Sequence, residues 1–433
     1  MKNYIVYLLV MIVVICGCPV PSSAAEEPKL YAKAAVLMDA DTGRVLYGRA
    51  PDEALPMAST TKIMTLILAL EYGNPDDVVT VSSYAAKMPE VRLGLHAGDR
   101  YVLQDLLYSM MLESHNDSAC AVAEQVGGSV EAFAQMMNRK AAEIGLHDTY
   151  FITPNGLDAE DAVGVHSTTA EDLAKLMRYC VFVSEEKEEF QEICQTRQYT
   201  FASCDGTRQF TVYNKNALLD QMDGVLAGKT GFTGNAGYCY VAAVNVGEKH
   251  FIVALLACGW PHNKHYKWAD TRALLAYGDA NYEYREIELA GVHIPAIPVA
   301  EGLEPTISGT CEGKLTVLLS DSETVQQRFV PESGLTAPVT RGDMVGTLQV
   351  SIGDPACRIS GVCGRNSRQK GFFLLYWNGI RCIFLLRSKR PFPSSMHIIE
   401  YRKEDVTAYA EYHCFRTRSA DGECRRIFLS SWI

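Results

Sequence analysis

The chain has 433 residues, of which 48% are hydrophobic and 21% charged. This balance is typical of a globular protein and excludes a disordered or fibrous one, and the length predicts two or three domains. The net charge of −11 gives no reason to expect a nucleic-acid partner. The charge is uneven, because residues 351–433 carry 14 Lys and Arg against 7 Asp and Glu. That split separates a basic tail from an acidic body.

The N-terminus has the pattern of a signal peptide. Lys2 precedes an apolar core over Tyr4–Cys18, and Ser23–Ala25 is a small-residue cleavage site. The apolar core is short for a membrane span. Lipoprotein processing at Cys18 is the alternative, but Cys16 is unusual for such a site. We therefore predict a signal peptide over residues 1–25 and export of the mature chain.

Fourteen cysteines in an exported chain would normally indicate disulfides. Here they are scattered, several lie in apolar surroundings, and no spacing suggests a zinc site or a redox pair. We expect most of them to be small buried hydrophobic residues, and we expect no bound metal. The scattered set is Cys120, Cys180, Cys194, Cys204, Cys239, Cys258 and Cys311.

The mature chain opens with a β-hairpin, predicted by the apolar runs 34–38 and 45–47 around a glycine turn. A buried helix is then expected to begin near Ser59, because a long apolar run follows it. Residues three apart share a helix face, so the Ser59 hydroxyl should lie beside the Lys62 amine. Serine is a poor nucleophile without an adjacent base. Lysine can be that base if burial or a second cation lowers its pKa.

A second polar cluster follows an apolar helical stripe that starts at Leu103. Ser114, His115 and Asn116 lie on the short connection before a helix predicted over residues 119–126. Asn116 or Asp117 can cap that helix, and a glycine pair ends it. Capping is the structural alternative to a catalytic role for these three residues.

The rest of the first domain is predicted to be helical and then to turn to strands. A helix is expected over residues 130–144, and Thr168–Glu171 has the pattern of a capping box before another helix. Lys229-Thr230-Gly231 then opens an antiparallel meander that a last helix follows. This order predicts an α+β domain with helices packed on an antiparallel sheet.

The C-terminal third predicts a small all-β domain and an atypical tail. Residues 281–286 are the expected link, and short β-like runs over 291–353 contain no catalytic constellation that we can identify. Residues 372–386 are apolar but interrupted, with basic residues on both sides. They could form an interfacial membrane anchor, or the tail could be poorly packed or aberrant. We place the domains at 26–282 (catalytic), 283–355 (small β domain) and 356–433 (tail).

Three motifs occur in order: Ser59-x-x-Lys62, Ser114-x-Asn116 and Lys229-Thr230-Gly231. Each is common alone, but the joint match is far more specific. The set resembles that of the active-site serine penicillin-recognising enzymes. Over residues 30–353 the chain is most similar to low-molecular-weight D-alanyl-D-alanine carboxypeptidases of the penicillin-binding protein 5 type. That resemblance implies a β-lactamase/transpeptidase-like catalytic domain followed by a small β domain. The tail does not match it, and a frameshifted or foreign 3′ end is one explanation.

The resemblance also implies roles for the motif residues. Ser59 would attack the terminal peptide bond and hold the acyl group, with Lys62 as its base. Ser114 would pass a proton toward the leaving D-alanine amine, and Asn116 would hold a substrate amide. Lys229 would add positive charge that keeps Lys62 deprotonated and attracts a carboxylate.

The strand of the third motif would bind the substrate backbone. Thr230 and Gly231 would lie beside an extended peptide, since glycine permits close approach. The backbone N–H groups of Ser59 and Phe232 would form the oxyanion hole. Phe232 replaces a residue that is often polar in relatives, which predicts an altered substrate preference. His115 is also unusual, and we favour a structural role for it over contact with substrate.

The function implied is a serine-type D-Ala-D-Ala carboxypeptidase. It would be an exported hydrolase at the outer face of the cytoplasmic membrane that trims peptidoglycan stem peptides, needs no cofactor and is inhibited by β-lactams. A serine β-lactamase is the nearest rival, and it would need a carboxylate such as Glu160 or Asp161 to hold a water. A non-catalytic cell-wall-binding scaffold is a second rival, and a docking role for the β domain is a third.

Overall fold

The computed structural model describes residues 27–309, 311, 313–339 and 344–353, and the backbone of several strands after residue 353. The predicted signal peptide lies outside these residues. The chain divides into two compact units, residues 1–385 and 386–433.

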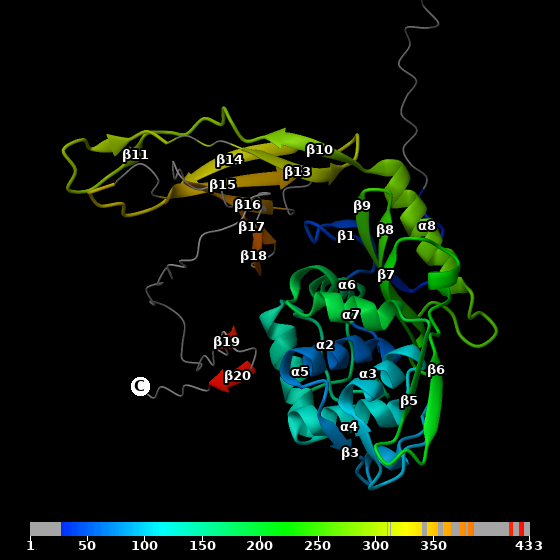
Figure 1. The fold of residues 1–433 in the computed structure, drawn as a ribbon. Coiled ribbons are helices and arrows are strands. Elements are labelled where there is room, and N and C mark those ends of the chain that lie inside the picture. Colours follow the sequence, from blue (N-terminus) through cyan, green and yellow to red (C-terminus); the bar gives the residue numbers. More distant parts are fainter. Residues whose placement is uncertain are drawn as a thin grey trace, which may run out of the picture. The chain divides into compact units, whose positions relative to one another are not determined.

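The centre of the first unit is a five-stranded antiparallel sheet, ordered β2-β1-β9-β8-β7 (Figure 1). It confirms the predicted hairpin and meander, and it places the N-terminal strand beside β9, which leaves β7 at an edge. The strands are β1 (Ala34–Asp39), β2 (Val45–Arg49), β7 (Val225–Thr233), β8 (Gly237–Val246) and β9 (Lys249–Leu256).

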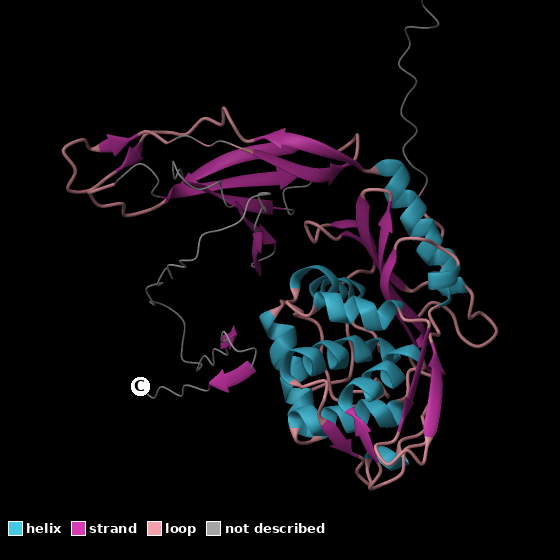
Figure 2. Cartoon of the chain, viewed as in Figure 1, coloured by secondary structure: helices cyan, strands magenta, loops and turns pink. Residues whose placement is uncertain are grey.

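Both faces of this sheet are buried, because helices cover each of them. Successive side chains on a strand point to opposite faces. Val36, Val241 and Ala254 belong to a core shared with the main group of helices, whereas Leu37 and Ala242 pack with helix α8 (Tyr266–Asn281). The result is the predicted α+β layering of helices on an antiparallel sheet (Figure 2).

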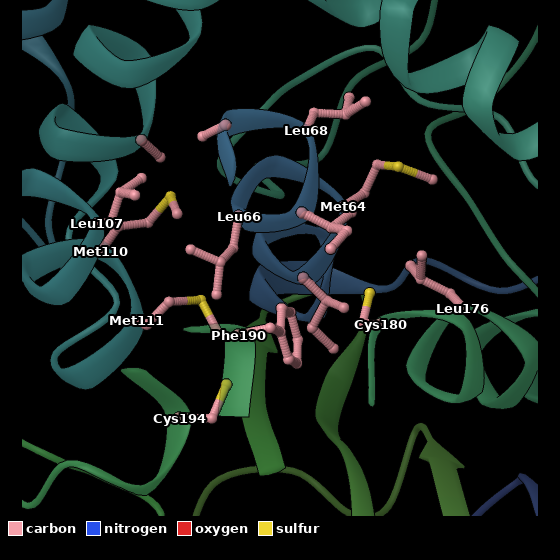
Figure 3. Packing of buried hydrophobic residues seen from close by; sticks show 14 of the residues in the cluster. Met64, Leu66, Leu68, Leu107, Met110, Met111, Leu176, Cys180, Phe190 and Cys194 are labelled. Atoms are coloured by element: carbon pink, nitrogen blue, oxygen red, sulfur yellow. The ribbon is translucent and has the colours of Figure 1, made fainter. Parts of the chain in front are cut away.

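Helix α2 (Lys62–Tyr72) lies in the middle of the main group of helices and is buried along its first nine residues. A helix that is apolar all round must be enclosed. Its Met64, Leu66 and Leu68 meet side chains from several other helices, including Met110 and Phe190 (Figure 3). The surrounding helices are α3 (Leu103–Leu112), α4 (Asn116–Gly127), α5 (Val130–Glu143), α6 (Ala170–Arg178) and α7 (Lys187–Gln195).

Short elements complete this part of the chain. Among them, the hairpin formed by β5 and β6 was not predicted, and Ser59 lies in the 3₁₀ turn η1, directly before α2. These elements are η1 (Ala58–Thr61), β3 (Val78–Thr80), η2 (Ala85–Lys87), β4 (Arg100–Val102), η3 (Tyr179–Val183), β5 (Gln198–Ala202), β6 (Gln209–Tyr213) and η4 (Ala217–Asp220).

Two predictions of helix caps were wrong. Helix α4 begins at Asn116 rather than at residue 119, and His115 occupies its N-cap position without a side-chain bond. The Asn116 side chain instead accepts a hydrogen bond from Lys62, and the Asp117 carboxylate accepts backbone N–H groups of residues 93–95. Helix α6 is capped by Thr169, whose hydroxyl accepts the N–H of Asp172 at 3.0 Å, one residue later than the predicted box. Gly128 ends α4 in the left-handed conformation as expected.

A β region follows α8, as predicted, and has a hydrophobic cluster of its own around Ile287, Val317 and Leu348. The segment expected as a link instead ends α8 and begins β10. The strands are β10 (Glu283–Glu288), β11 (Ile297–Pro298), β12 (Thr306–Ile307), β13 (Lys314–Leu319), β14 (Val325–Pro331) and β15 (Met344–Ile352).

Strands also occur in the predicted tail. The backbone of β16 (Arg358–Gly364), β17 (Phe373–Trp377) and β18 (Ile380–Phe384) continues the sheet of β14 and β15. In the second unit, β19 (Phe415–Arg418) pairs with β20 (Cys424–Ile427). No helix in the described part of the chain is long and apolar enough to cross a membrane.

The cysteine prediction agrees with the described residues. Cys120, Cys180, Cys194, Cys239 and Cys258 are buried thiols outside any disulfide. Burial raises the pKa of the Cys120 thiol to about 12. These cysteines are therefore packing residues rather than reactive ones.

Candidate active site

Ser59 and Lys62 meet as the first motif predicts. The turn η1 runs directly into α2, and it places the Lys62 Nζ 2.8 Å from the Ser59 Oγ. Lys62 is fully buried, whereas Ser59 is partly exposed and can be reached from solvent. Burial, and then the nearby charge of Lys229, lower the pKa of Lys62 well below its usual value. The amine is therefore poised as a base.

Three oxygens surround the Lys62 Nζ. Besides Ser59, they are the Asn116 Oδ1 at 2.9 Å and the backbone carbonyl of Asn155 at 2.5 Å. The Asn116 amide is oriented by its other end, since its Nδ2 donates to the Pro89 carbonyl at 3.2 Å. Its oxygen therefore faces the lysine.

This set of partners fixes the direction of the lone pair on Lys62. A carbonyl oxygen only accepts hydrogen bonds, so Asn116 and Asn155 take the two N–H groups that a neutral amine has. The third direction, toward the Ser59 hydroxyl, is left for the lone pair. Ser59 can therefore donate its proton to Lys62, which is the geometry that a general base requires.

A second pair joins the other two motifs. The Lys229 Nζ on β7 donates to the Ser114 Oγ at 2.9 Å and to the Thr230 carbonyl at 2.9 Å. Ser114 has a φ of +69°, which is rare for a residue other than glycine. Burial lowers the pKa of Lys229 to about 7. Its charge is thus sensitive to pH near neutrality, and an anion bound beside it would raise that pKa.

Two glycines allow other segments to approach the nucleophile turn. A Cβ on Gly156, whose φ is +86°, would lie 1.9 Å from the Ala58 carbonyl oxygen. A Cβ on Gly231 would lie 2.9 Å from the Ser59 nitrogen. Real side chains do not tolerate such contacts. The backbone around Ser59 is therefore held between β7 and the loop that contains Asn155 and Gly156.

The start of α4 also holds the segment at residues 89–95. The Asn116 N–H donates to the Val91 carbonyl at 2.7 Å. The Asp117 carboxylate accepts the backbone N–H groups of Leu93, Gly94 and Leu95 at 2.8–3.0 Å. Asp117 thus organises a loop next to Asn116, which explains why it does not cap its helix.

The two unusual motif positions differ in exposure. The Phe232 side chain is 42% exposed, and its ring lies 4.7 Å from that of Tyr238. His115 is buried, with its Nδ1 2.8 Å from the Ser109 Oγ and its Nε2 3.5 Å from the Glu113 carboxylate. Burial lowers the pKa of His115. His115 therefore packs against α3, in line with a structural role.

The acidic residues considered for a β-lactamase are exposed on a surface loop. Asp161 accepts the N–H groups of Val163 and Gly164 and the hydroxyl of Tyr150. These bonds close its own loop. Glu160 is exposed as well, so neither residue has the buried setting of a water-holding base.

One group of the site, the backbone carbonyl of Asn155, was given no role from the sequence. The Asn155 carbonyl is a backbone group, so no side-chain motif marks it. The Asn155-Gly156 pair signals a tight turn, but not the segment that the turn contacts. No group of His, Cys, Asp and Glu in the described residues is arranged to hold a metal ion.

Substitution Gly156→Ala should impair the nucleophile without removing any catalytic side chain. The new Cβ would displace the Ala58 carbonyl, and misplacing a reacting group by about 1 Å can cost roughly a hundredfold in rate. We expect the rate of labelling of Ser59 by a fluorescent penicillin to fall at least about tenfold. Gly164→Ala in the same loop is the matched control, because its Cβ would meet nothing closer than 3.5 Å. Equal rates for the two variants would contradict this account of the turn.

Comparison with known proteins identifies the family of this chain. The family model described as D-alanyl-D-alanine carboxypeptidase matches residues 22–258. The chain is 29% identical to the D-alanyl-D-alanine carboxypeptidase DacF of Bacillus subtilis over 355 residues, 80% of this chain and 88% of that protein. It is 31% identical to DacB2 of Mycobacterium tuberculosis over 237 residues, 54% of this chain and 78% of that protein.

A solved structure extends the likeness to the fold. The structure of penicillin-binding protein 5 from Haemophilus influenzae has a TM-score of 0.62 and 26% identity, and it covers 78% of this chain and 97% of that one. The resemblance drawn from the three motifs is thus confirmed over most of the chain. This protein belongs to the D-alanyl-D-alanine carboxypeptidase family.

Proposed function

We propose that this chain removes the terminal D-alanine from peptidoglycan stem pentapeptides through an acyl ester on Ser59. β-Lactams would inhibit it by forming the same kind of ester. The observation that carries the proposal is the pairing of Ser59 with a buried amine, Lys62, at 2.8 Å. The two N–H groups of that amine are already directed to Asn116 and Asn155.

Acylation begins when the Ser59 Oγ attacks the carbonyl of the penultimate D-alanine and Lys62 takes the hydroxyl proton. The negative charge that develops on the carbonyl oxygen is stabilised by the N–H groups of Ser59 and Phe232. The carbon–nitrogen bond then breaks as Ser114 delivers its proton to the leaving amine. Ser114 regains a proton from the protonated Lys62, which returns Lys62 to the free base before hydrolysis. The bond from Lys229 to Ser114 at 2.9 Å orients that hydroxyl.

Substrate would bind along the edge strand β7, which is not paired on its outer side within the five-stranded sheet. Thr230 and Gly231 offer backbone groups to an extended peptide. Lys229 attracts the terminal carboxylate. Asn116 can hold a substrate amide if its Nδ2 exchanges the 3.2 Å bond to Pro89 for the substrate.

Hydrolysis of the ester completes the reaction. A water molecule attacks the acyl carbon and gives its proton to Lys62, and Ser59 leaves with a proton returned to it. A fast β-lactamase would need a carboxylate that holds this water, and Asp161 is used to close its own loop. The ester formed with penicillin should therefore be long-lived.

The direct test compares the purified full chain with its Ser59→Ala variant. Diacetyl-Lys-D-Ala-D-Ala supplies the peptide bond and a fluorescent penicillin supplies the label. The wild-type chain should release D-alanine and carry a lasting penicillin adduct by intact mass, since Ser59 is the nucleophile. The variant should do neither.

Other results would favour the rival functions. Rapid penicillin turnover without D-alanine release would indicate a β-lactamase. An inert wild-type chain would indicate a cell-wall-binding scaffold. Labelling retained in Ser59→Ala would assign the nucleophile to another residue.

A pH experiment tests the role of Lys229. Its ammonium is present below a pKa of about 7 and is lost above it. The rate of acylation by benzylpenicillin, divided by the rate for its methyl ester, should therefore fall severalfold between about pH 6 and pH 9. The ratio isolates the carboxylate, because the titration of Lys62 affects both compounds alike. A ratio that does not change with pH would remove Lys229 from carboxylate recognition.

We also propose that the chain acts at the outer face of the cytoplasmic membrane and that its basic tail contacts anionic lipid. The support is the predicted signal peptide and the excess of Lys and Arg in residues 351–433. The full chain should float with vesicles that contain anionic lipid at low salt, and salt should release it. The Lys389→Glu/Arg390→Glu variant should bind less. Absence of flotation at low salt would contradict this part of the proposal.

A further inference from the structure

A buried histidine lies behind the nucleophile turn. The Nε2 of His166 is 2.9 Å from the hydroxyl oxygen of Thr61, and that hydroxyl donates to the Ala58 carbonyl at 2.8 Å. His166 and Thr61 are almost completely buried. The three motifs do not include His166, and Thr61 lies within the first motif at a position that the motif leaves unspecified.

The hydrogen bonds of His166 fix its tautomer. Its Nδ1 accepts the backbone N–H of Ile152 at 2.9 Å, so that nitrogen carries no proton. The neutral ring then carries its proton on Nε2 and donates it to Thr61. Burial lowers the pKa of His166 to about 4, which agrees with a neutral ring. The direction of this series of hydrogen bonds is thus set: His166 donates to Thr61, and Thr61 donates to Ala58.

The last hydrogen bond of this series, from Thr61 to the Ala58 carbonyl, affects the oxyanion hole directly. The carbonyl of Ala58 and the N–H of Ser59 belong to the same planar peptide unit and point in opposite directions. Fixing the carbonyl therefore fixes the direction of the N–H. The unit needs such support, because Ala58 has a φ of +50°, a strained conformation for a residue other than glycine.

We propose that His166 and Thr61 are positioning residues that aim and polarise the Ser59 N–H for the transition state. A hydrogen bond to the carbonyl of a peptide unit strengthens its N–H as a donor, since chains of hydrogen bonds polarise one another. This inference rests on the proposed function, in which that N–H stabilises the tetrahedral intermediate. It adds two residues that act through Ala58 and do not touch the substrate.

Substitution Thr61→Val tests the proposal with little change in shape. The value of kcat for D-alanine release from diacetyl-Lys-D-Ala-D-Ala should fall about tenfold to a hundredfold. This fall is no larger than the loss of rate expected when a whole oxyanion-hole donor is removed. KM should stay within about twofold, because the interaction is made mainly in the transition state. Thr61→Ser keeps the hydroxyl and should restore most of the rate.

The neighbouring residue provides a matched control. Thr60 is equally buried, and its hydroxyl donates to the Met57 carbonyl at 2.6 Å, one peptide unit before the one that carries the Ser59 N–H. Thr60→Val should cost similar stability by thermal unfolding but should leave kcat within about threefold. If the Thr61→Val substitution acted only by loosening the turn, Thr60→Val and Thr61→Val would lower kcat alike, and this result would contradict the proposal.

Variants of His166 test the first link. Gln can present an N–H to Thr61 and Met cannot, so His166→Gln should keep more activity than His166→Met. The double variant Thr61→Val/His166→Met should be no slower than Thr61→Val alone, since both substitutions interrupt the same series of hydrogen bonds. A boronic acid that forms a tetrahedral adduct on Ser59 should bind the Thr61→Val variant more weakly by the same factor as the fall in kcat/KM.

The proposal is overturned if Thr61→Val retains the wild-type kcat, if Thr61→Ser is as slow as Thr61→Val, or if the loss lies in KM alone. These outcomes are distinct from failure of the proposed function. If the proposed function fails, the wild-type chain itself will release no D-alanine, and both proposals will fall together.

Discussion

The buried amine of Lys62 is the feature on which the rest of this structure depends. An ammonium buried in an apolar core is costly unless it is paired with an opposite charge. Helix α2 is enclosed by other helices, and the three hydrogen-bond partners of the Lys62 Nζ are uncharged oxygens. The surroundings therefore favour the free base. The same burial that completes the hydrophobic core makes the lysine able to take a proton from Ser59.

The site is assembled from four parts of the chain that are far apart in sequence. They are the turn before α2, the start of α4, the loop around Asn155 and the edge strand β7. Each part contributes backbone groups as well as side chains. Close contact between them is possible because Gly156 and Gly231 have no Cβ. The sheet order matters too, since inserting β1 beside β9 leaves β7 at an edge of the five-stranded sheet.

Much of this arrangement could be predicted from the sequence, and the rest could not for definite physical reasons. Alternating and helical hydrophobic patterns identified the meander and the helix after Ser59, because burial dictates them. The three motifs identified side chains that the structure brings together, because Ser59 and Asn116 contact Lys62 and Ser114 contacts Lys229. The cap of α4 was misassigned because tertiary contacts outweighed local preference: Asn116 is used by Lys62, and Asp117 by the loop at residues 93–95. The contact of the Asn155 carbonyl with Lys62 and the bond between His166 and Thr61 join segments that are far apart in the sequence. No local sequence pattern predicts which distant segments meet.

The central claim is that burial and the charge of Lys229 favour the free base of Lys62 beside Ser59, and the titration of this lysine tests it most directly. The full chain can be labelled with ¹³C at the lysine ε carbons, and the Lys62 signal assigned by its loss in Lys62→Arg. The Lys62 signal should titrate well below the ordinary lysine pKa of about 10.4, because burial and the charge of Lys229 both lower its pKa. A Lys62 signal that remains that of an ammonium up to about pH 10 would contradict it.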